Sequence, residues 1–363
     1  MGIKIDAKEL VDILTMTPPD QNIMIVGRHG IGKSQIATEF YKRKKLKVVS
    51  FFLGQMSDPG DLIGLMHKDE KTGHSEFLPP YWWPIDDKPI VLFLDELNRA
   101  RPEILQSVMD LTLNKTLAGK SLPKGSIVVS AVNEGDEYQL TDLDPALVSR
   151  FNVYEFAPTV EDWLIWANEY HIDQRVIHFI QENNQFLDSD IHDKKEGFSF
   201  GTKLEKFPDR RAWEKVSNFL KPIKEVKDIH IKIISGIVGT AAAIHFRKSL
   251  DSILTISPEQ ILLSFEKYKD KLKNLKLKEF IFINEQIIYW LNTGNYKKNQ
   301  KDTILKNCYQ YLLYLKNAKL NEGIAHIASM LENEKFQKVT SLLIGESEQI
   351  LTLLSEYIES IRV

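Results

Sequence analysis

Short apolar runs alternate with segments of helical periodicity over the first 157 residues of the chain. The runs are rich in β-branched and aromatic residues, which is typical of buried strands. They lie at 23–26, 47–53, 90–94 and 126–132. Between them, as at 33–41, apolar residues recur at helical spacing. Strands that alternate with helices in this way predict an α/β fold with a mostly parallel sheet and helices on both of its faces.

The strand pattern ends near Pro158, and helical periodicity continues from there to the end of the sequence. The helices predicted before residue 257 lie at 161–169, 174–183, 211–220 and 229–246. The length of 363 residues also exceeds the size at which a single hydrophobic core stops growing. We therefore predict three parts: an α/β domain at 1–157, a helical domain at 158–256 and a helical C-terminal extension at 257–363.

Two short excursions interrupt the α/β pattern. Residues 63–77 contain Lys71-Thr72-Gly73 between short apolar pieces, and residues 116–122 contain Ala118-Gly119-Lys120. Glycine-containing turns between apolar pieces are typical of hairpins. We therefore predict two hairpins that lie outside the main sheet.

Composition and charge narrow the classes of function. The apolar and charged fractions, 43% and 27%, are those of an ordinary globular protein. The net charge of −3 differs from the strongly positive charge that is typical of a dedicated nucleic-acid binder. The basic cluster at 42–47 still leaves a local nucleic-acid site open. The one cysteine, Cys308, can form no internal disulfide and no cysteine metal cluster. Without a leader pattern or an apolar run of bilayer length, we expect a cytoplasmic protein with no membrane insertion.

Residues 27–34 have the sequence Gly-Arg-His-Gly-Ile-Gly-Lys-Ser, which fits the phosphate-loop pattern between a predicted strand and a predicted helix. Its glycines let backbone N–H groups converge on phosphate oxygens, and the helix N-terminus adds positive potential. Lys33 would reach the β- and γ-phosphates of ATP, and the Ser34 hydroxyl would ligate Mg²⁺. The residues assigned to nucleotide binding are Gly27, Arg28, His29, Gly30, Ile31, Gly32, Lys33, Ser34 and Gln35.

Two adjacent acids follow the predicted strand at 90–94. Carboxylates at the C-terminal edge of a parallel strand lie where open α/β sheets bind ligands. Asp95 would hold Mg²⁺, mostly through its water, and Glu96 would orient or deprotonate the water that attacks ATP. The alternative is that the pair ends the strand and caps the next helix. The presence of a phosphate loop favours the catalytic interpretation.

Three further polar positions each admit two interpretations on local sequence alone. Asn133 follows the strand at 126–132 and could hydrogen-bond the γ-phosphate or the attacking water, or it could form a turn. Arg150 could form a surface ion pair, or it could stabilise charge on the ATP of a neighbouring subunit. Arg210 and Arg211 start a predicted helix and provide a third cationic candidate.

Taken in chain order, these motifs resemble the MoxR family of AAA+ ATPases over roughly the first two-thirds of the chain. The acidic motif at 94–100, Leu-Asp-Glu-Leu-Asn-Arg-Ala, is part of the resemblance. Residues 54–64, 79–84 and 162–167 are similar to the subgroup encoded beside proteins with von Willebrand factor A-type domains. The chain departs from the family at 133–135, where Asn-Glu-Gly replaces the frequent Asn-Pro, and its C-terminal extension has no family match.

The resemblance implies a P-loop AAA+ parallel sheet core with a helical lid and a helical C-terminal extension, binding ATP and Mg²⁺. It implies that Asn133 is the first sensor and that Arg150 is an arginine finger acting on a neighbour's ATP. Arg211 would be the second sensor, with Arg210 as the alternative if the alignment slips by one residue. The two predicted hairpins would correspond to family inserts that face the central pore of a ring, or they could be plain surface loops.

We therefore expect a homo-oligomeric ring, a hexamer, that hydrolyses ATP held between subunits. By family resemblance its output would be chaperone-like remodelling or assembly of a partner protein, one with a von Willebrand factor A-type domain. One alternative is a non-motor switch, in which ATP binding assembles a scaffold. Another is a nucleic-acid remodelling ATPase that uses residues 42–47 and the two inserts. A metabolic kinase fits less well, because the acidic pair with Asn133 and Arg150 suits water as the acceptor.

Overall fold

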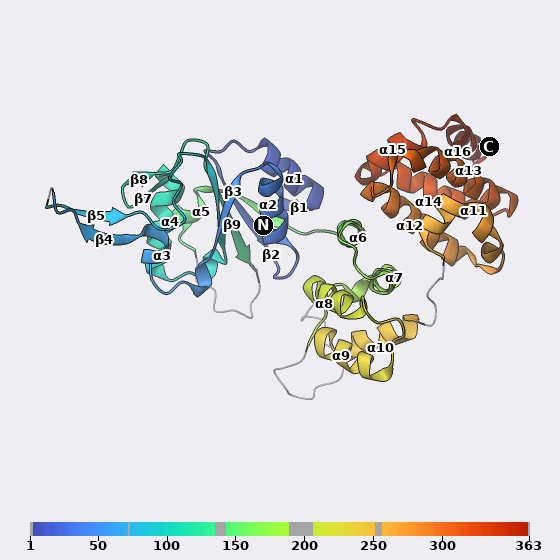
Figure 1. The fold of residues 1–363 in the computed structure, drawn as a ribbon, viewed down its shortest axis with the longest axis horizontal. Coiled ribbons are helices and arrows are strands. Elements are labelled where there is room, and N and C mark those ends of the chain that lie inside the picture. The colour runs from blue at the N-terminus through green and yellow to red at the C-terminus, as the bar shows by residue number, and fades with distance from the viewer. Residues whose placement is uncertain (1–2, 72, 135–142, 189–205, 251–255, 362–363) are drawn as a thin grey trace. The chain divides into compact units, whose positions relative to one another are not determined.

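A computed structural model describes residues 3–71, 73–134, 143–188, 206–250 and 256–361 of the chain. The chain divides into two compact units, Met1–Thr159 and Val160–Val363. The first unit carries all of the strands among the described residues, and the second is built from helices (Figure 1).

A six-stranded sheet forms the centre of the first unit, with the strand order β1-β10-β2-β9-β6-β3. Every neighbouring pair in this sheet runs parallel. Its strands are β1 (Ile3–Ile5), β2 (Asn22–Gly27), β3 (Lys47–Phe52), β6 (Ile90–Asp95), β9 (Ile127–Asn133) and β10 (Phe151–Phe156). The predicted parallel α/β fold is confirmed, although the three-residue β1 carries too little apolar pattern to be predicted from sequence.

Side chains that alternate along the strands feed two hydrophobic cores, one on each face of the sheet. On β6, Val91 and Phe93 belong to one core, whereas Leu92 and Leu94 belong to the other. This follows from the two-residue period of a strand. The first core is covered by α1 (Ala7–Met16) and α2 (Lys33–Arg43), and the second by α3 (Gly60–Ile63), α4 (Pro102–Asn114) and α5 (Pro145–Val148).

Both predicted hairpins are present and form separate two-stranded sheets. One pairs β4 (Leu65–Lys68) with β5 (Ser75–Leu78), and the other pairs β7 (Thr116–Leu117) with β8 (Lys120–Ser121). Thr72, in the first turn, lies outside the described residues. The β4–β5 hairpin exposes three large apolar side chains, Leu65, Met66 and Leu78, which are 70%, 65% and 47% accessible.

The second unit contains eleven α-helices among its described residues. They are α6 (Val160–Glu169), α7 (Gln174–Glu182), α8 (Arg210–Leu220), α9 (Asp228–Val238), α10 (Thr240–Ser249), α11 (Pro258–Tyr268), α12 (Leu277–Thr293), α13 (Lys301–Asn317), α14 (Asn321–Glu332), α15 (Gln337–Leu343) and α16 (Glu348–Ile361). The single helix predicted at 229–246 is wrong, because Gly239 separates α9 from α10. Gly239 has φ +86°, and a Cβ there would lie 2.2 Å from the Lys206 carbonyl oxygen.

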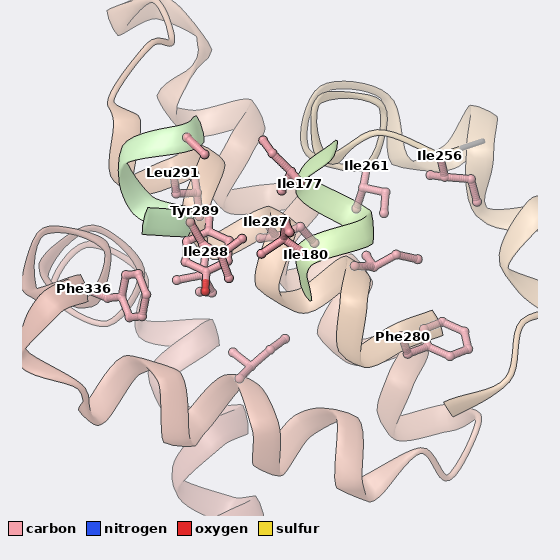
Figure 2. Close-up of a cluster of buried hydrophobic side chains, with 14 of the residues drawn as sticks. Ile177, Ile180, Ile256, Ile261, Phe280, Ile287, Ile288, Tyr289, Leu291 and Phe336 are labelled. Atoms are coloured by element: carbon pink, nitrogen blue, oxygen red, sulfur yellow. The ribbon is translucent and has the colours of Figure 1, made fainter. Parts of the chain in front are cut away.

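One hydrophobic cluster runs through the second unit from α6 to α16. Figure 2 shows part of it, where Ile177 and Ile180 of α7 lie in the same cluster as Ile261 of α11 and Ile287 of α12. The helical domain predicted at 158–256 and the extension predicted at 257–363 therefore share buried apolar side chains. Among the described residues, no helix has both the length and the apolar character needed to cross a membrane.

Polar side chains join the same helices beside this cluster. Gln181 of α7 donates a hydrogen bond of 2.6 Å to Oε2 of Glu285 on α12, and the other carboxylate oxygen lies 3.6 Å from Nε2 of His326 on α14. Burial raises the pKa of Glu285 to about 7, a change that the Gln181 hydrogen bond opposes and the Glu161 carboxylate on α6 reinforces. Burial also lowers the pKa of His326. Two groups with displaced pKa values therefore lie at this junction.

Replacing Glu285 with Gln should make the free energy of unfolding less dependent on pH. In the folded protein Glu285 holds its proton up to a pH of about 7, whereas an unfolded glutamate loses it near its ordinary value of 4.5. Folding is therefore favoured by a neutral Glu285 at low pH, and this contribution is lost as the pH rises from 4.5 through about 7. The loss is at most about 3 kcal/mol, since one unit of pKa difference corresponds to about 1.4 kcal/mol.

We expect Glu285→Gln to raise the thermal midpoint of the full chain at pH 8 and to leave it nearly unchanged at pH 5. Thermal unfolding followed across this range checks the expectation. Glu332→Gln, on the exposed end of α14, is the matched control and should show no such divergence from wild type. If Glu285→Gln shifted the thermal midpoint equally at both pH values, that result would contradict a raised pKa for the buried Glu285 carboxyl.

Candidate active site

Three neighbouring strands bring the predicted site residues to one edge of the sheet. Strand β9 lies between β2 and β6, and all three run in the same direction. In the register of β2 and β9, Gly27 pairs with Asn133, and β6 ends beside them at Asp95. The carboxyl ends of parallel strands form the edge where open α/β sheets bind ligands. The phosphate loop, the acidic pair and Asn133 are therefore next to one another.

The phosphate loop leads from β2 into α2 through Gly32, the N-cap residue, which has φ +97°. Residues with a Cβ rarely adopt this left-handed backbone conformation, so glycine suits the turn. The helix starts at Lys33, whose side chain is only 5% accessible. Its ammonium donates to the carbonyl oxygens of Gly27 at 2.7 Å and Arg28 at 2.5 Å, and to Oδ1 of Asn133 at 2.9 Å. These acceptors offset the cost of burying the charge.

Ser34 and Asp95 form the second contact between the loop and the strand edge. The Ser34 hydroxyl donates a hydrogen bond of 2.7 Å to Oδ2 of Asp95. Mg²⁺ prefers oxygen ligands and is held in nucleotide sites by one or two protein oxygens together with phosphates and water. A hydroxyl and a carboxylate that converge in this way have the chemistry of that ligand set. The residues present therefore fit Mg²⁺, and its binding by Ser34 and Asp95 stays a prediction.

Glu96 has an unusual backbone, because its φ is +55°. For a residue with a side chain this left-handed conformation costs roughly 1–2 kcal/mol. It turns the chain from β6 into the short 3₁₀-helix Leu97–Arg99. Its carboxylate oxygen Oε1 accepts from Nδ2 of Asn133 at 3.4 Å and lies 3.2 Å from the Arg99 guanidinium. The side chain keeps 25% of its surface accessible, so solvent can reach it.

Asn133 connects the cation and the carboxylate of the site. Its side-chain oxygen accepts from Lys33, and its side-chain nitrogen donates to Glu96. The backbone carbonyl of Asn133 accepts a 2.8 Å hydrogen bond from the buried side chain of Asn98. Asn133 therefore ends strand β9 beside Lys33 and Glu96 rather than forming a turn. Its contact with the γ-phosphate or the attacking water stays a prediction. Glu134 follows on the strand edge, and Gly135 lies outside the described residues.

The remaining residues assigned to nucleotide binding line the same loop. Arg28 and His29 are exposed, and Gly30 and Ile31 are half-buried. Gln35, in the first turn of α2, hydrogen-bonds Glu39 at 3.2 Å. Their contacts with a nucleotide stay predictions.

Arg150 lies elsewhere in the first unit, just before β10. Its guanidinium donates to the carbonyl oxygen of Met109 in α4, and its own carbonyl accepts from Asn22 at 2.9 Å. Asn22 also accepts from Lys115, whose pKa burial lowers to about 8. Within one subunit, Arg150 thus bonds α4 rather than the cluster around Lys33. A role on a neighbouring subunit's ATP stays a prediction.

The two candidate arginines of the second unit differ in exposure. Arg210 is buried, and its Nε lies 2.9 Å from Oδ2 of Asp188. Arg211 is exposed on the first turn of α8, which begins after the N-cap Asp209. Arg210 is therefore occupied by a structural ion pair, which leaves Arg211 as the better candidate for the second sensor.

A comparison with known families decides what kind of domain carries this site. The model of an AAA domain, dynein-related subfamily, matches residues 22–151. That range begins with β2 and ends at the start of β10, so it contains the phosphate loop, the acidic pair and Asn133. Residues 22–151 form an AAA+ ATPase domain. The predicted P-loop AAA+ core of the chain is confirmed.

Among curated relatives, a protein of Thauera aromatica provisionally named as the chaperone BssE is 30% identical over 141 residues. The match covers 36% of this chain and 49% of BssE, so the chain spans about half the length of the curated relative it matches.

Solved structures similar to the chain include the Thermotoga maritima RuvB Holliday junction branch migration motor. It matches 75% of this chain and 78% of its own, with a TM-score of 0.37 and 12% identity. A provisionally assigned ATPase from Cytophaga hutchinsonii is also similar, with a TM-score of 0.31 and 15% identity. The match covers 86% of this chain and 74% of the Cytophaga chain. Scores of this size add nothing to the AAA+ domain match as evidence about function.

Sequence analysis assigns no role to Asn98, Arg99 or Gly54, all of which lie at the site. Asn98 and Arg99 follow the acidic pair on the 3₁₀-helix, and their polar character after a buried strand is the signal that could have found them. Gly54 follows β3, the strand that pairs with β6. Only that pairing brings Gly54 to Glu96, so local sequence alone gives Gly54 no partner at the site.

We expect Lys33→Ala to abolish ATP binding. The substitution removes the buried ammonium that the loop holds in place to reach phosphate, so affinity should fall by at least about 100-fold, on the scale of losing a charge-assisted contact. Titration with a fluorescent ATP analogue measures this. Lys42→Ala removes an exposed cation at the other end of α2 and is the matched control. Unchanged affinity in Lys33→Ala would show that the loop does not hold the phosphates.

Proposed function

We propose that this chain is a MoxR-type ATPase that assembles into a homo-oligomeric ring, a hexamer, and uses ATP hydrolysis to remodel or assemble a partner protein. The observation that carries the ATPase proposal is the set of bonds at one sheet edge: Ser34 to Asp95, and Lys33 to Asn133 to Glu96. A phosphate-binding cation, a metal-binding pair and a general base thus share one site.

In the proposed reaction a water oxygen attacks the γ-phosphorus of ATP as the bond to the β–γ bridging oxygen breaks, giving ADP and inorganic phosphate. Glu96 orients this water and accepts its proton. Lys33 binds the β- and γ-phosphates, and Asn133 keeps Lys33 and Glu96 at a fixed separation. Mg²⁺, held by Ser34 and Asp95, would neutralise charge on the phosphate oxygens.

The ring belongs to the proposal because Arg150, which we predict to act on ATP, contacts α4 within its own AAA+ domain. Arg150 bonds a carbonyl of α4 rather than the cluster around Lys33, which is compatible with presenting charge to a neighbour's γ-phosphate. Arg211 would sense the nucleotide from the helical unit and convert its state into motion. The cytoplasm, which supplies ATP, is the compartment in which we propose that the ring works.

A protein partner is supported by the hairpins and by the named relative. The β4–β5 hairpin exposes Leu65 and Met66, and apolar side chains at a hairpin suit contact with another polypeptide. BssE carries the name of a chaperone. We propose that the hairpins face the ring pore and contact the partner. The resemblance of residues 54–64, 79–84 and 162–167 to the subgroup associated with von Willebrand factor A-type domains supports a protein of that class as the partner we propose.

We expect Glu96→Gln to bind ATP with near wild-type affinity while turnover falls by about 100-fold or more, because the amide cannot accept the proton of water. Phosphate release and analogue binding measure the two effects. The ATP-bound variant should also retain its partner, so affinity capture with ATP and Mg²⁺, followed by mass spectrometry, should recover a von Willebrand factor A-domain protein that Lys33→Ala does not recover. Wild-type turnover in Glu96→Gln would refute its role as the base.

We expect Arg150→Ala to bind ATP but lose turnover by about 1,000-fold, as removal of an arginine finger does. A mixing experiment tests whether the arginine acts across subunits. A Lys33→Ala subunit keeps Arg150 but cannot bind ATP. An Arg150→Ala subunit binds ATP but lacks the arginine that would act on its neighbour's ATP. Random mixing in equal parts unites an intact pocket with a neighbour's intact arginine at about one interface in four, so about a quarter of wild-type turnover should return. No recovery on mixing would exclude action in trans.

A further inference from the structure

The Glu96 carboxylate is held unequally at its two oxygens. Oε1 is contacted by both Asn133, at 3.4 Å, and the Arg99 guanidinium, at 3.2 Å. Oε2 faces Gly54, where an added Cβ would lie 3.0 Å from it. One oxygen is therefore fixed by two donors, while the other lies beside a residue that has no side chain.

The backbone turn at Glu96 also determines where the Arg99 side chain lies. The left-handed conformation at Glu96 starts the 3₁₀-helix, in which the Arg99 N–H donates to the Glu96 carbonyl at 2.9 Å. Three residues make about one turn of a 3₁₀-helix, so the side chains at these two positions lie one above the other. The turn that strains Glu96 is thus the turn that places a cation against its carboxylate.

Gly54 lies next to both Arg99 and the second carboxylate oxygen of Glu96. A Cβ built on Gly54 would come within 2.9 Å of the Arg99 Cβ and 3.0 Å of Glu96 Oε2. Real Cβ atoms essentially never come as close as the 2.9 Å contact with the Arg99 Cβ, so a side chain at Gly54 would force Arg99 or its own backbone to shift. The 3.0 Å contact with Glu96 Oε2 is tighter than nine in ten real Cβ contacts, so the carboxylate would also have to give way. The φ of Gly54 is not positive, so its lack of a side chain, and not backbone freedom, is what the site requires.

We propose that Arg99 and Gly54 are positioning residues for the general base: Arg99 fixes Oε1 of Glu96, and the missing side chain at Gly54 leaves Oε2 open to the attacking water. This inference rests on the proposed ATPase function. Neither residue touches the reacting atoms, and both act through the orientation of Glu96. Misplacing a catalytic group by about 1 Å costs up to about 100-fold in rate.

The first test is Arg99→Ala in the full chain. We expect kcat for ATP hydrolysis to fall about 10- to 100-fold, with the KM for ATP and the affinity for a fluorescent ATP analogue within about twofold of wild type. Arg99→Lys should recover part of kcat, since a lysine can still contact Oε1. Arg101→Ala is the matched control, because this exposed arginine is two residues away and its guanidinium donates to the Ser57 carbonyl oxygen, at 3.5 Å.

A double-mutant cycle shows whether Arg99 acts through Glu96. In the Glu96→Gln background, Arg99→Ala should lower the residual turnover no further, because the group that it orients is already inactive. An independent 10-fold loss in that background would overturn the proposal. So would full turnover in Arg99→Ala alone.

Gly54→Ala tests the other oxygen by adding one methyl group. We expect kcat to fall about 10-fold with nucleotide affinity unchanged. The contact with the Arg99 Cβ should also lower the thermal midpoint, so turnover is compared at temperatures where the variant remains folded. Gly236→Ala is the control, since a Cβ on Gly236 meets nothing within 4 Å. A Gly54→Ala variant with wild-type kcat would overturn the part of the proposal that concerns Oε2.

Failure of this inference can be told apart from failure of the proposed function. If wild type shows no ATP turnover, or if Glu96→Gln turns over normally, the ATPase function itself is wrong. If Glu96→Gln is inactive while Arg99→Ala and Gly54→Ala are fully active, the function stands and the positioning role is wrong. Loss of ATP affinity in Arg99→Ala would likewise contradict a role confined to Glu96.

Discussion

The site depends on one amide, that of Asn133, placed between a buried cation and a carboxylate. Its oxygen accepts from Lys33 and its nitrogen donates to Glu96, so each end of the amide meets the group that its polarity suits. A carboxylate at this position would repel Glu96, and an aliphatic side chain would leave Lys33 with fewer acceptors in a buried place. The central position of β9, between β2 and β6, is what lets one side chain reach both.

The parallel sheet makes this arrangement rigid enough to carry local strain. Glu96 adopts a left-handed backbone that costs free energy by itself, yet the residue before it ends a fully buried strand and the residues after it form a hydrogen-bonded turn. Asn98 extends from that turn to hold the backbone of Asn133. The acidic strand end and the sensor strand are therefore fixed to each other by side chains, in addition to the ladder between β6 and β9.

Local sequence predicts the parts of the site that lie within continuous motifs, and misses those that depend on strand pairing. The phosphate loop and the acidic pair each occupy one segment, so their chemistry could be predicted before their convergence was visible. Asn133 could equally have formed a turn, because its partners lie 37 and 100 residues away along the chain. Gly54 meets Glu96 only through the register of β3 with β6. The helix break at Gly239 similarly depends on contact with a distant carbonyl.

The second unit shows why helical periodicity alone does not define its internal division. Periodicity suggests a boundary near residue 256, but α6 and α7 are bonded to helices beyond it. Asp162 of α6 pairs with Lys335 at 2.7 Å, and Gln181 of α7 bonds Glu285 of α12. Since these polar contacts lie beside a shared apolar cluster, separating α6 and α7 from the helices after residue 257 would expose apolar surface and break both polar contacts together. Any movement of α6 and α7 should therefore carry α12 with it.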